Sequence, residues 1–216
     1  SDDKPKVDEE KLPKTALYPV NYPLGAFGVT SQPQRPAVVC FQNATIWTSG
    51  PAGILKNARV IGNGGKLAAV GTDVAVPEGA LIIDLAGKHL TPGVIDCHSH
   101  SATDGGINEA TQSVTAEVRV GDFIDADHIE IYRQLAGGVT TINVLHGSAN
   151  TIGGQNQVLK LRWGAAPEKM KFEGAPAGIK FALGENVKQA NWGDRFTTRY
   201  PQSRMGVDQV VRDTFR

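Results

Sequence analysis

The stretch His89–His100 has the sequence HLTPGVIDCHSH, and it decides how the rest of the chain is interpreted. An apolar run, interrupted by a Thr-Pro-Gly turn, predicts a buried strand that ends abruptly in polar residues. Neighbouring side chains of a strand point to opposite faces, so His98 and His100 project to the same side. Imidazole is a common ligand of zinc and related divalent ions. The pair therefore predicts half of a metal site, and the alternative is two buried histidines held by hydrogen bonds.

The overall composition favours a globular protein without a charged binding surface. The 216 residues include 22 basic and 22 acidic side chains, so the formal net charge is zero. Proteins that bind nucleic acid or anionic membranes usually carry a basic excess or patch. No apolar run approaches the roughly 18 residues of a membrane span. We therefore expect neither a nucleic acid nor a membrane as a partner.

The N-terminal sequence does not decide the cellular compartment of the protein. The chain begins SDDKPKVDEEKLPK without an initiator methionine, and such a leader fits a mature exported protein or a cytoplasmic tail. We expect a periplasmic or secreted protein slightly more than a cytoplasmic one. Cys40 and Cys97 lie in apolar segments, and we expect both to be buried free thiols.

Three regions are expected along the chain. Residues 1–36 are polar and rich in proline, which predicts an extended arm without a core of its own. In residues 37–90, short β-branched or apolar runs alternate with turn clusters, a pattern typical of a small β-sandwich or barrel. Residues 91–216 alternate helical and strand patterns, which predicts an α/β region with parallel strands.

Within the α/β region, the sequence predicts two helices and three strands beyond His100. One helix is expected in DADHIEIYRQLAGG (125–138), with Ile129, Tyr132 and Leu135 at helical spacing. Strands are expected in VTTINVLHG (139–147), NQVLKLRWG (156–164) and AGIKFALG (177–184). A second, amphipathic helix is expected in SRMGVDQVVRDTF (203–215), with an apolar stripe formed by Met205, Val207, Val210, Val211 and Phe215.

Further candidate site residues lie at or near the predicted strand ends, where parallel α/β folds bind their ligands. His146 ends one strand, and two roles are open for it: contact with substrate, or holding the next loop by hydrogen bonds. The glycine-rich segment that follows lacks phosphate-binding motifs and is expected to line the pocket, with Gln155 and Asn156 as polar contacts for substrate. Lys180 interrupts an apolar strand, where an unpaired ammonium would be costly. An exposed strand end is the alternative for Lys180.

The segment LTPGVIDCHSH resembles the first-strand motif of the amidohydrolase superfamily, and HGSANTIGGQNQVLKLR and AGIKFALGENVK are similar to segments of its imidazolonepropionase-like and Xaa-Pro-dipeptidase-like branch. The resemblance covers residues 37–216. It implies a small β-sandwich followed by the first half of a (β/α)₈ barrel, incomplete in this chain because a whole barrel takes about 250 residues. It also implies metal-assisted hydrolysis, mostly of C–N bonds.

The same resemblance implies roles for individual residues. His98 and His100 would bind the more buried metal, and Asp96 would fix the strand end as a hydrogen-bonding group behind these ligands. Lys180, carboxylated by CO₂, would bridge two metal ions, and Glu185 is the alternative bridge. We expect one or two divalent ions, zinc first among them. The later metal-binding histidines and the general base of the family have no counterpart here, and we expect them outside this chain.

Three functional hypotheses follow. The first is a metal-dependent hydrolase that cleaves amide, peptide or cyclic-amide bonds of a small molecule or peptide by metal-activated water. The second is a deaminase on the same scaffold, and the third is a non-catalytic binding subunit with a degenerate site. For the enzyme, we expect a second polypeptide that carries the remaining barrel strands, at least two histidines and a catalytic aspartate. We expect the pair to form a homo-oligomer.

Overall fold

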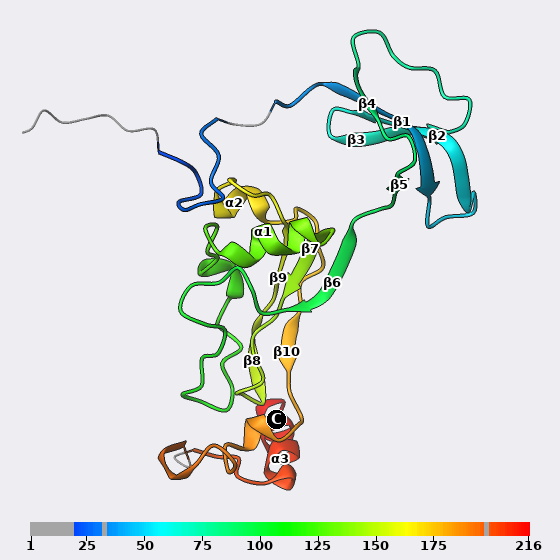
Figure 1. Cartoon of the computed structure of the whole chain (residues 1–216). Coiled ribbons are helices and arrows are strands. Elements are labelled where there is room, and N and C mark those ends of the chain that lie inside the picture. The colour runs from blue at the N-terminus through cyan, green and yellow to red at the C-terminus, as the bar shows by residue number, and fades with distance from the viewer. Residues whose placement is uncertain (1–19, 32–33, 197–198) are drawn as a thin grey trace, which may run out of the picture.

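The structure is a computed structural model that describes residues 20–31, 34–196 and 199–216 (Figure 1). Residues 1–19, most of the predicted arm, lie outside these ranges. The described residues form sheets, short helices and long connecting loops, in agreement with the predicted α/β class. Among their helices, none has the length and apolar character needed to cross a bilayer.

The residues from 38 to 90 form a five-stranded sheet, seen at the upper right of Figure 1. Strand β1 (Val38–Trp47) pairs antiparallel with β2 (Ile54–Asn63), which pairs antiparallel with β3 (Lys66–Gly71). Strand β1 also pairs in parallel with β4 (Leu81–Asp84) and, further along, with β5 (His89–Leu90). The β-rich character expected from the turn clusters is confirmed.

This sheet has a small core of its own. Ala44 and Ile46 on β1 are buried together with Ala58 and Val60 on β2. Each pair is two residues apart, as expected for side chains on one face of a strand. Partly buried apolar side chains pack against this cluster, among them Leu90 just before the Thr-Pro-Gly turn. The sheet therefore stabilises the chain up to the start of the histidine motif.

A second sheet contains β6 (Val94–Ser99), β7 (Val139–Val144) and β9 (Gln157–Lys160). Strands β6 and β7 are parallel, and helix α1 (Ile129–Ala136) lies in the connection between them, as the sequence predicts. Strand β9 pairs antiparallel with β7, so the expectation of successive parallel strands is wrong at this point. Parallel neighbours usually need a crossover helix, and none lies between β7 and β9.

A two-stranded antiparallel sheet contains β8 (Ile152–Gln155) and β10 (Ile179–Phe181). The short helix α2 (Pro167–Met170) follows β9, and α3 (Arg204–Thr214) ends the chain. Short 3₁₀ turns form η2 (Val120–Asp122), η3 (Asn186–Lys188) and η4 (Asp194–Phe196). Figure 1 shows β8 and β10 side by side between the second sheet and α3.

The main core of the α/β region lies between α1, the second sheet and the loop that precedes α1. It contains ten buried residues: Ala102, Val120, Ile124, Ala126, Ile131, Ile142, Val144, Leu159, Leu161 and Met170. Ile142 and Val144 of β7 and Leu159 of β9 belong to this core, and β6 is held by its pairing with β7. The end of β6 positions His98 and His100, whereas Lys180 lies on β10 of the two-stranded sheet.

Helices α1 and α3 each bury a narrower face than their apolar patterns predict. Helix α1 buries Ile131, whereas Tyr132 of the predicted stripe is 37% exposed. Helix α3 buries Val207 and Val210, but Met205 and Phe215 stay largely exposed. The reason is that α3 packs on one side only, where Val207 joins a small cluster with Ala182 and Val187.

Candidate metal site

The two histidines of the opening motif meet at the C-terminal end of β6. The Nε2 atoms of His98 and His100 are 3.2 Å apart. Two nitrogens bound to one tetrahedral zinc ion at about 2.05 Å would lie about 3.3 Å apart, so the observed spacing fits a shared ion. Nδ1 of His100 lies 2.9 Å from the carbonyl oxygen of Leu145. A proton on Nδ1 donates to that carbonyl and leaves Nε2 free to bind metal.

Strand β10 brings Lys180 to the same place, although 82 residues separate it from His98 in the sequence. Its Nζ atom lies 3.2 Å from Nε2 of His98. Burial lowers the pKa of Lys180. The pKa of His98 is also lowered, first by the charge on Lys180 and then by burial and by His100. Both shifts favour the neutral groups, which are the forms that bind a metal ion or react with CO₂.

Asp96 stabilises the end of β6 through a hydrogen bond with the backbone of His98. Its Oδ1 accepts a hydrogen bond from the backbone N–H of His98 at 3.0 Å. This contact holds the chain where β6 ends, and the negative charge of Asp96 partly offsets the lowering of the pKa of His98. The geometry is the one expected of a hydrogen-bonding group behind the ligands, and its role in metal binding stays a prediction.

Glu185, the alternative bridge, is occupied by other partners. Its carboxylate oxygens pair with Lys188 at 2.5 Å and with Arg204 at 2.9 Å. These partners lower the pKa of Glu185, with the hydrogen bond from Lys188 as the first cause. Among the described residues, no group of three His, Cys, Asp or Glu side chains is placed to hold a metal ion, so Glu185 does not join the histidine pair. The structure favours Lys180 of the two candidates.

Most of strand β6 is exposed rather than buried, which corrects the expectation from its apolar sequence. Val94 and Ile95 are 55% and 69% exposed, and Cys97 is exposed instead of buried. In the described part of the chain β6 pairs only with β7, so its other edge has no neighbouring strand. Two imidazoles and one lysine do not fill the coordination shell of a metal ion. The site is therefore partial in these residues.

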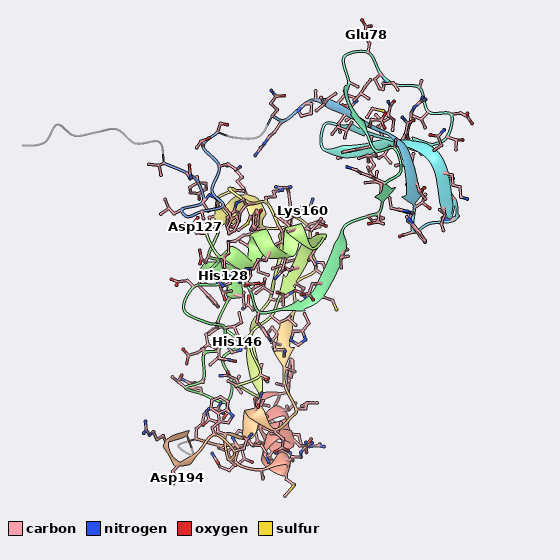
Figure 2. The ribbon with its side chains drawn as sticks, in the orientation of Figure 1. Glu78, Asp127, His128, His146, Lys160 and Asp194 are labelled. Atoms are coloured by element: carbon pink, nitrogen blue, oxygen red, sulfur yellow. The ribbon has the colours of Figure 1, made fainter. Side chains whose placement is uncertain are left out.

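His146 has a different setting from the histidine pair. Figure 2 shows it beside β8. It is completely buried, and a Cβ atom at Gly153 would lie only 2.6 Å from its Nδ1. Its Nε2 accepts from the backbone N–H of Glu109 at 2.9 Å, and its Nδ1 lies 2.9 Å from the carbonyl oxygen of Gly147. These contacts match the second of the two roles left open for it, that of holding loops by hydrogen bonds.

Gln155 and Asn156 also use their side chains within the protein. Nε2 of Gln155 donates to the carbonyl oxygen of Ala116 at 3.0 Å. Nδ2 of Asn156 donates to Oδ1 of Asn143 at 2.7 Å. Contact with substrate stays a prediction for both. Sequence reasoning missed Asn143, although an asparagine inside a β-branched strand is unusual enough to have drawn notice.

Comparison with known proteins finds relatives for most of the chain but no matching protein-family model. Amidohydrolase tasK from Hapsidospora irregularis is 34% identical over 157 residues, which cover 65% of this chain and 16% of tasK. An imidazolonepropionase from Klebsiella pneumoniae is 28% identical over 134 residues, covering 51% of this chain and 33% of the relative. The chain thus spans well under half the length of these two proteins.

The fold has a counterpart among solved structures. An amidohydrolase from Thermotoga maritima aligns with a TM-score of 0.72 and 38% sequence identity, covering 82% of this chain and 46% of the other. The predicted combination of a β-rich part with an incomplete α/β part is thereby confirmed. The division at residue 90 and the closed barrel remain predictions.

Proposed function

This chain belongs to the amidohydrolase superfamily, as an N-terminal portion, and we propose that it supplies the first metal ligands of a hydrolase that cleaves C–N bonds. One observation carries the proposal. Nε2 of His98 lies 3.2 Å from Nε2 of His100 and also 3.2 Å from Nζ of Lys180, which strand β10 brings from 82 residues further along the chain. Ordinary packing of surface side chains does not require these three residues to converge, whereas a metal site does.

Each residue has a definite part in such a site. When bound, a divalent ion such as zinc polarises the carbonyl to be attacked and lowers the pKa of water. His98 and His100 would hold the ion through their Nε2 atoms. The carbonyl of Leu145 keeps the ring of His100 in the required orientation and tautomer. Asp96 restrains the backbone of His98 and so limits the movement of its ring.

Lys180 is proposed to act as a carbamate that bridges two ions. Its neutral amine would form an N–C bond to CO₂ as one C=O π bond opens, and it would lose one proton to water, which converts the neutral amine into an anion with two oxygen ligands. Partial burial lowers the pKa of Lys180 and so increases the fraction of neutral amine that can react. Without this modification, a protonated lysine 3.2 Å from His98 would oppose metal binding.

The remaining ligands and the general base are proposed to come from outside these 216 residues, on a second polypeptide that carries further barrel strands. The open edge of β6 supports this idea, as does an apolar hollow of about 590 Å³ on the five-stranded sheet. Its lining includes Phe41, Leu55 and Leu67. Exposed apolar surface of this kind marks an interaction site. We propose that the completed unit assembles as a homo-oligomer.

The test uses the assembled protein, stripped of metal and reloaded with zinc. N-acyl amino acids, dipeptides and cyclic amides are offered, and the products are identified by mass spectrometry. We expect a metal-dependent release of an amine together with a carboxylate, and its loss in His98→Ala. Release of ammonia with retention of the rest of the substrate would instead indicate a deaminase. Tight metal binding without turnover of any compound would indicate a binding subunit.

A further inference from the structure

We propose that Asn156 is a positioning residue that holds Lys180 beside His98. The consequence for metal binding rests on the proposed function, whereas the structural part does not. The two partners belong to different sheets: His98 lies on β6 of the three-stranded sheet, and Lys180 lies on β10 of the two-stranded sheet. Some contact between these sheets must therefore set the distance between the two side chains.

Asn156 occupies the point where the two sheets meet. It is the single residue between β8 and β9. Strand β8 pairs with β10, which carries Lys180, and β9 pairs with β7, which in turn pairs with β6. At Asn156 the chain passes directly from one sheet into the other, so a displacement of this residue changes the relation between them.

The hydrogen bonds of Asn156 extend towards both sides of the site. Its backbone N–H donates to the carbonyl oxygen of Gly178 at 3.0 Å, two residues before Lys180. Its Nδ2 donates to Oδ1 of Asn143 at 2.7 Å. Nδ2 of Asn143 donates in turn to the carbonyl oxygen of Cys97, the residue before His98, at 3.4 Å. A continuous series of contacts thus joins the neighbours of Lys180 and His98.

Strand β10 depends on this support because its own pairing is short and irregular. Only Ile179 and Phe181 have partners on β8, and the register shifts between them, where Lys180 lies. The contact of Asn156 with Gly178 restrains the chain immediately before this irregularity. The approach is close, since a Cβ atom at Gly178 would lie 3.2 Å from Oδ1 of Asn156. A shift of Asn156 would therefore move Lys180.

The experiment compares two substitutions that have the same chemistry in different places. Asn156→Asp keeps the shape of the side chain but replaces the amide donor with an oxygen that repels Oδ1 of Asn143. Asn150→Asp is the matched control, because Asn150 is fully buried and its Nδ2 donates to the carbonyl of Gln112 at 2.7 Å, outside the series of contacts. Asn156→Ala is a second variant in case the charged one fails to fold.

The assembled proteins are supplied with zinc and ¹³C-bicarbonate, and bound metal and the carbamate ¹³C signal are measured. We expect wild type and Asn150→Asp to bind about two ions with a carbamate signal, and both Asn156 variants to keep about one ion without it. A general loss of packing would affect Asn150→Asp equally. Retention of two ions and the signal by both Asn156 variants would overturn the proposal.

A wild type without bound metal would refute the proposed function and not the positioning role. Crystal structures of the metal-free wild type and Asn156→Ala then decide. A distance between Nζ of Lys180 and Nε2 of His98 that rises above about 4 Å in the variant would support the role, because such a distance exceeds a hydrogen bond. An unchanged distance would overturn it.

Discussion

His98 and His146 lie at the ends of neighbouring parallel strands, β6 and β7, yet their surroundings differ in every respect that matters for chemistry. His98 is exposed, and its Nε2 faces the Nε2 of His100 and the amine of Lys180. His146 is fully buried, and both of its nitrogens face backbone groups. A nitrogen that already has a backbone partner is not free to bind metal. The partners of a histidine, rather than its place at a strand end, determine what it can do.

The largest effect is expected from removing either histidine of the pair. His98→Ala or His100→Ala should abolish nearly all metal binding, since each would leave a single imidazole at the strand end. Elemental analysis of the assembled protein after dialysis measures the metal. His89→Ala is the control, because His89 is also exposed but bonds to Trp47 on the five-stranded sheet. Unchanged metal content in the pair variants would refute the site.

A smaller loss is expected from removing the proposed bridge. Lys180→Ala should lower the metal content by about half and remove nearly all turnover, because one ion would lose its bridging oxygen ligand. Glu185→Gln should leave both quantities unchanged, since Glu185 pairs with Lys188 and Arg204. The opposite pattern, with loss in Glu185→Gln alone, would assign the bridge to Glu185.

His146 should affect stability and not metal. His146→Ala removes a buried ring and leaves the N–H of Glu109 without its acceptor, which should lower the free energy of unfolding by roughly 3 kcal/mol. Urea denaturation of the assembled protein measures this change, and metal content per folded protein should stay at the wild-type value. Loss of metal at unchanged stability would instead place His146 in the metal site and remove the contrast with His98.

The smallest effect is a shift in the pKa of His98 in metal-free protein. The charge of Lys180 is the first cause of its lowering, so Lys180→Met should raise the pKa of His98 towards its ordinary value of 6.5. In wild type, this lowering makes folding less favourable as the pH falls through 6.5, since the unfolded chain then binds more protons. NMR titration of the imidazole measures the shift, with Lys188→Met as control. An unchanged pKa of His98 in Lys180→Met would show that the charge of Lys180 does not act on His98.

Several features of the fold could be predicted from local patterns. The helix at 129–136, the strand at 139–144 and the final helix all follow from apolar spacing and from capping or stop residues. The exposure of β6 could not be predicted in the same way. Its apolar sequence indicates burial, but burial depends on which other elements cover the strand. Among the described residues, β6 pairs only with β7, and its apolar side chains Val94 and Ile95 stay exposed.

The sequence by itself determined that His98 and His100 face one way, because side chains alternate along a strand whatever surrounds it. The resemblance of their motif to that of amidohydrolases also indicated which chemistry to look for. Only the tertiary structure decided that Lys180 joins them, that Glu185 does not and that His146 is closed off by backbone partners. These outcomes depend on contacts between segments such as β8 and β10, which lie far from β6 in the chain. No local pattern records which distant strand a residue will meet.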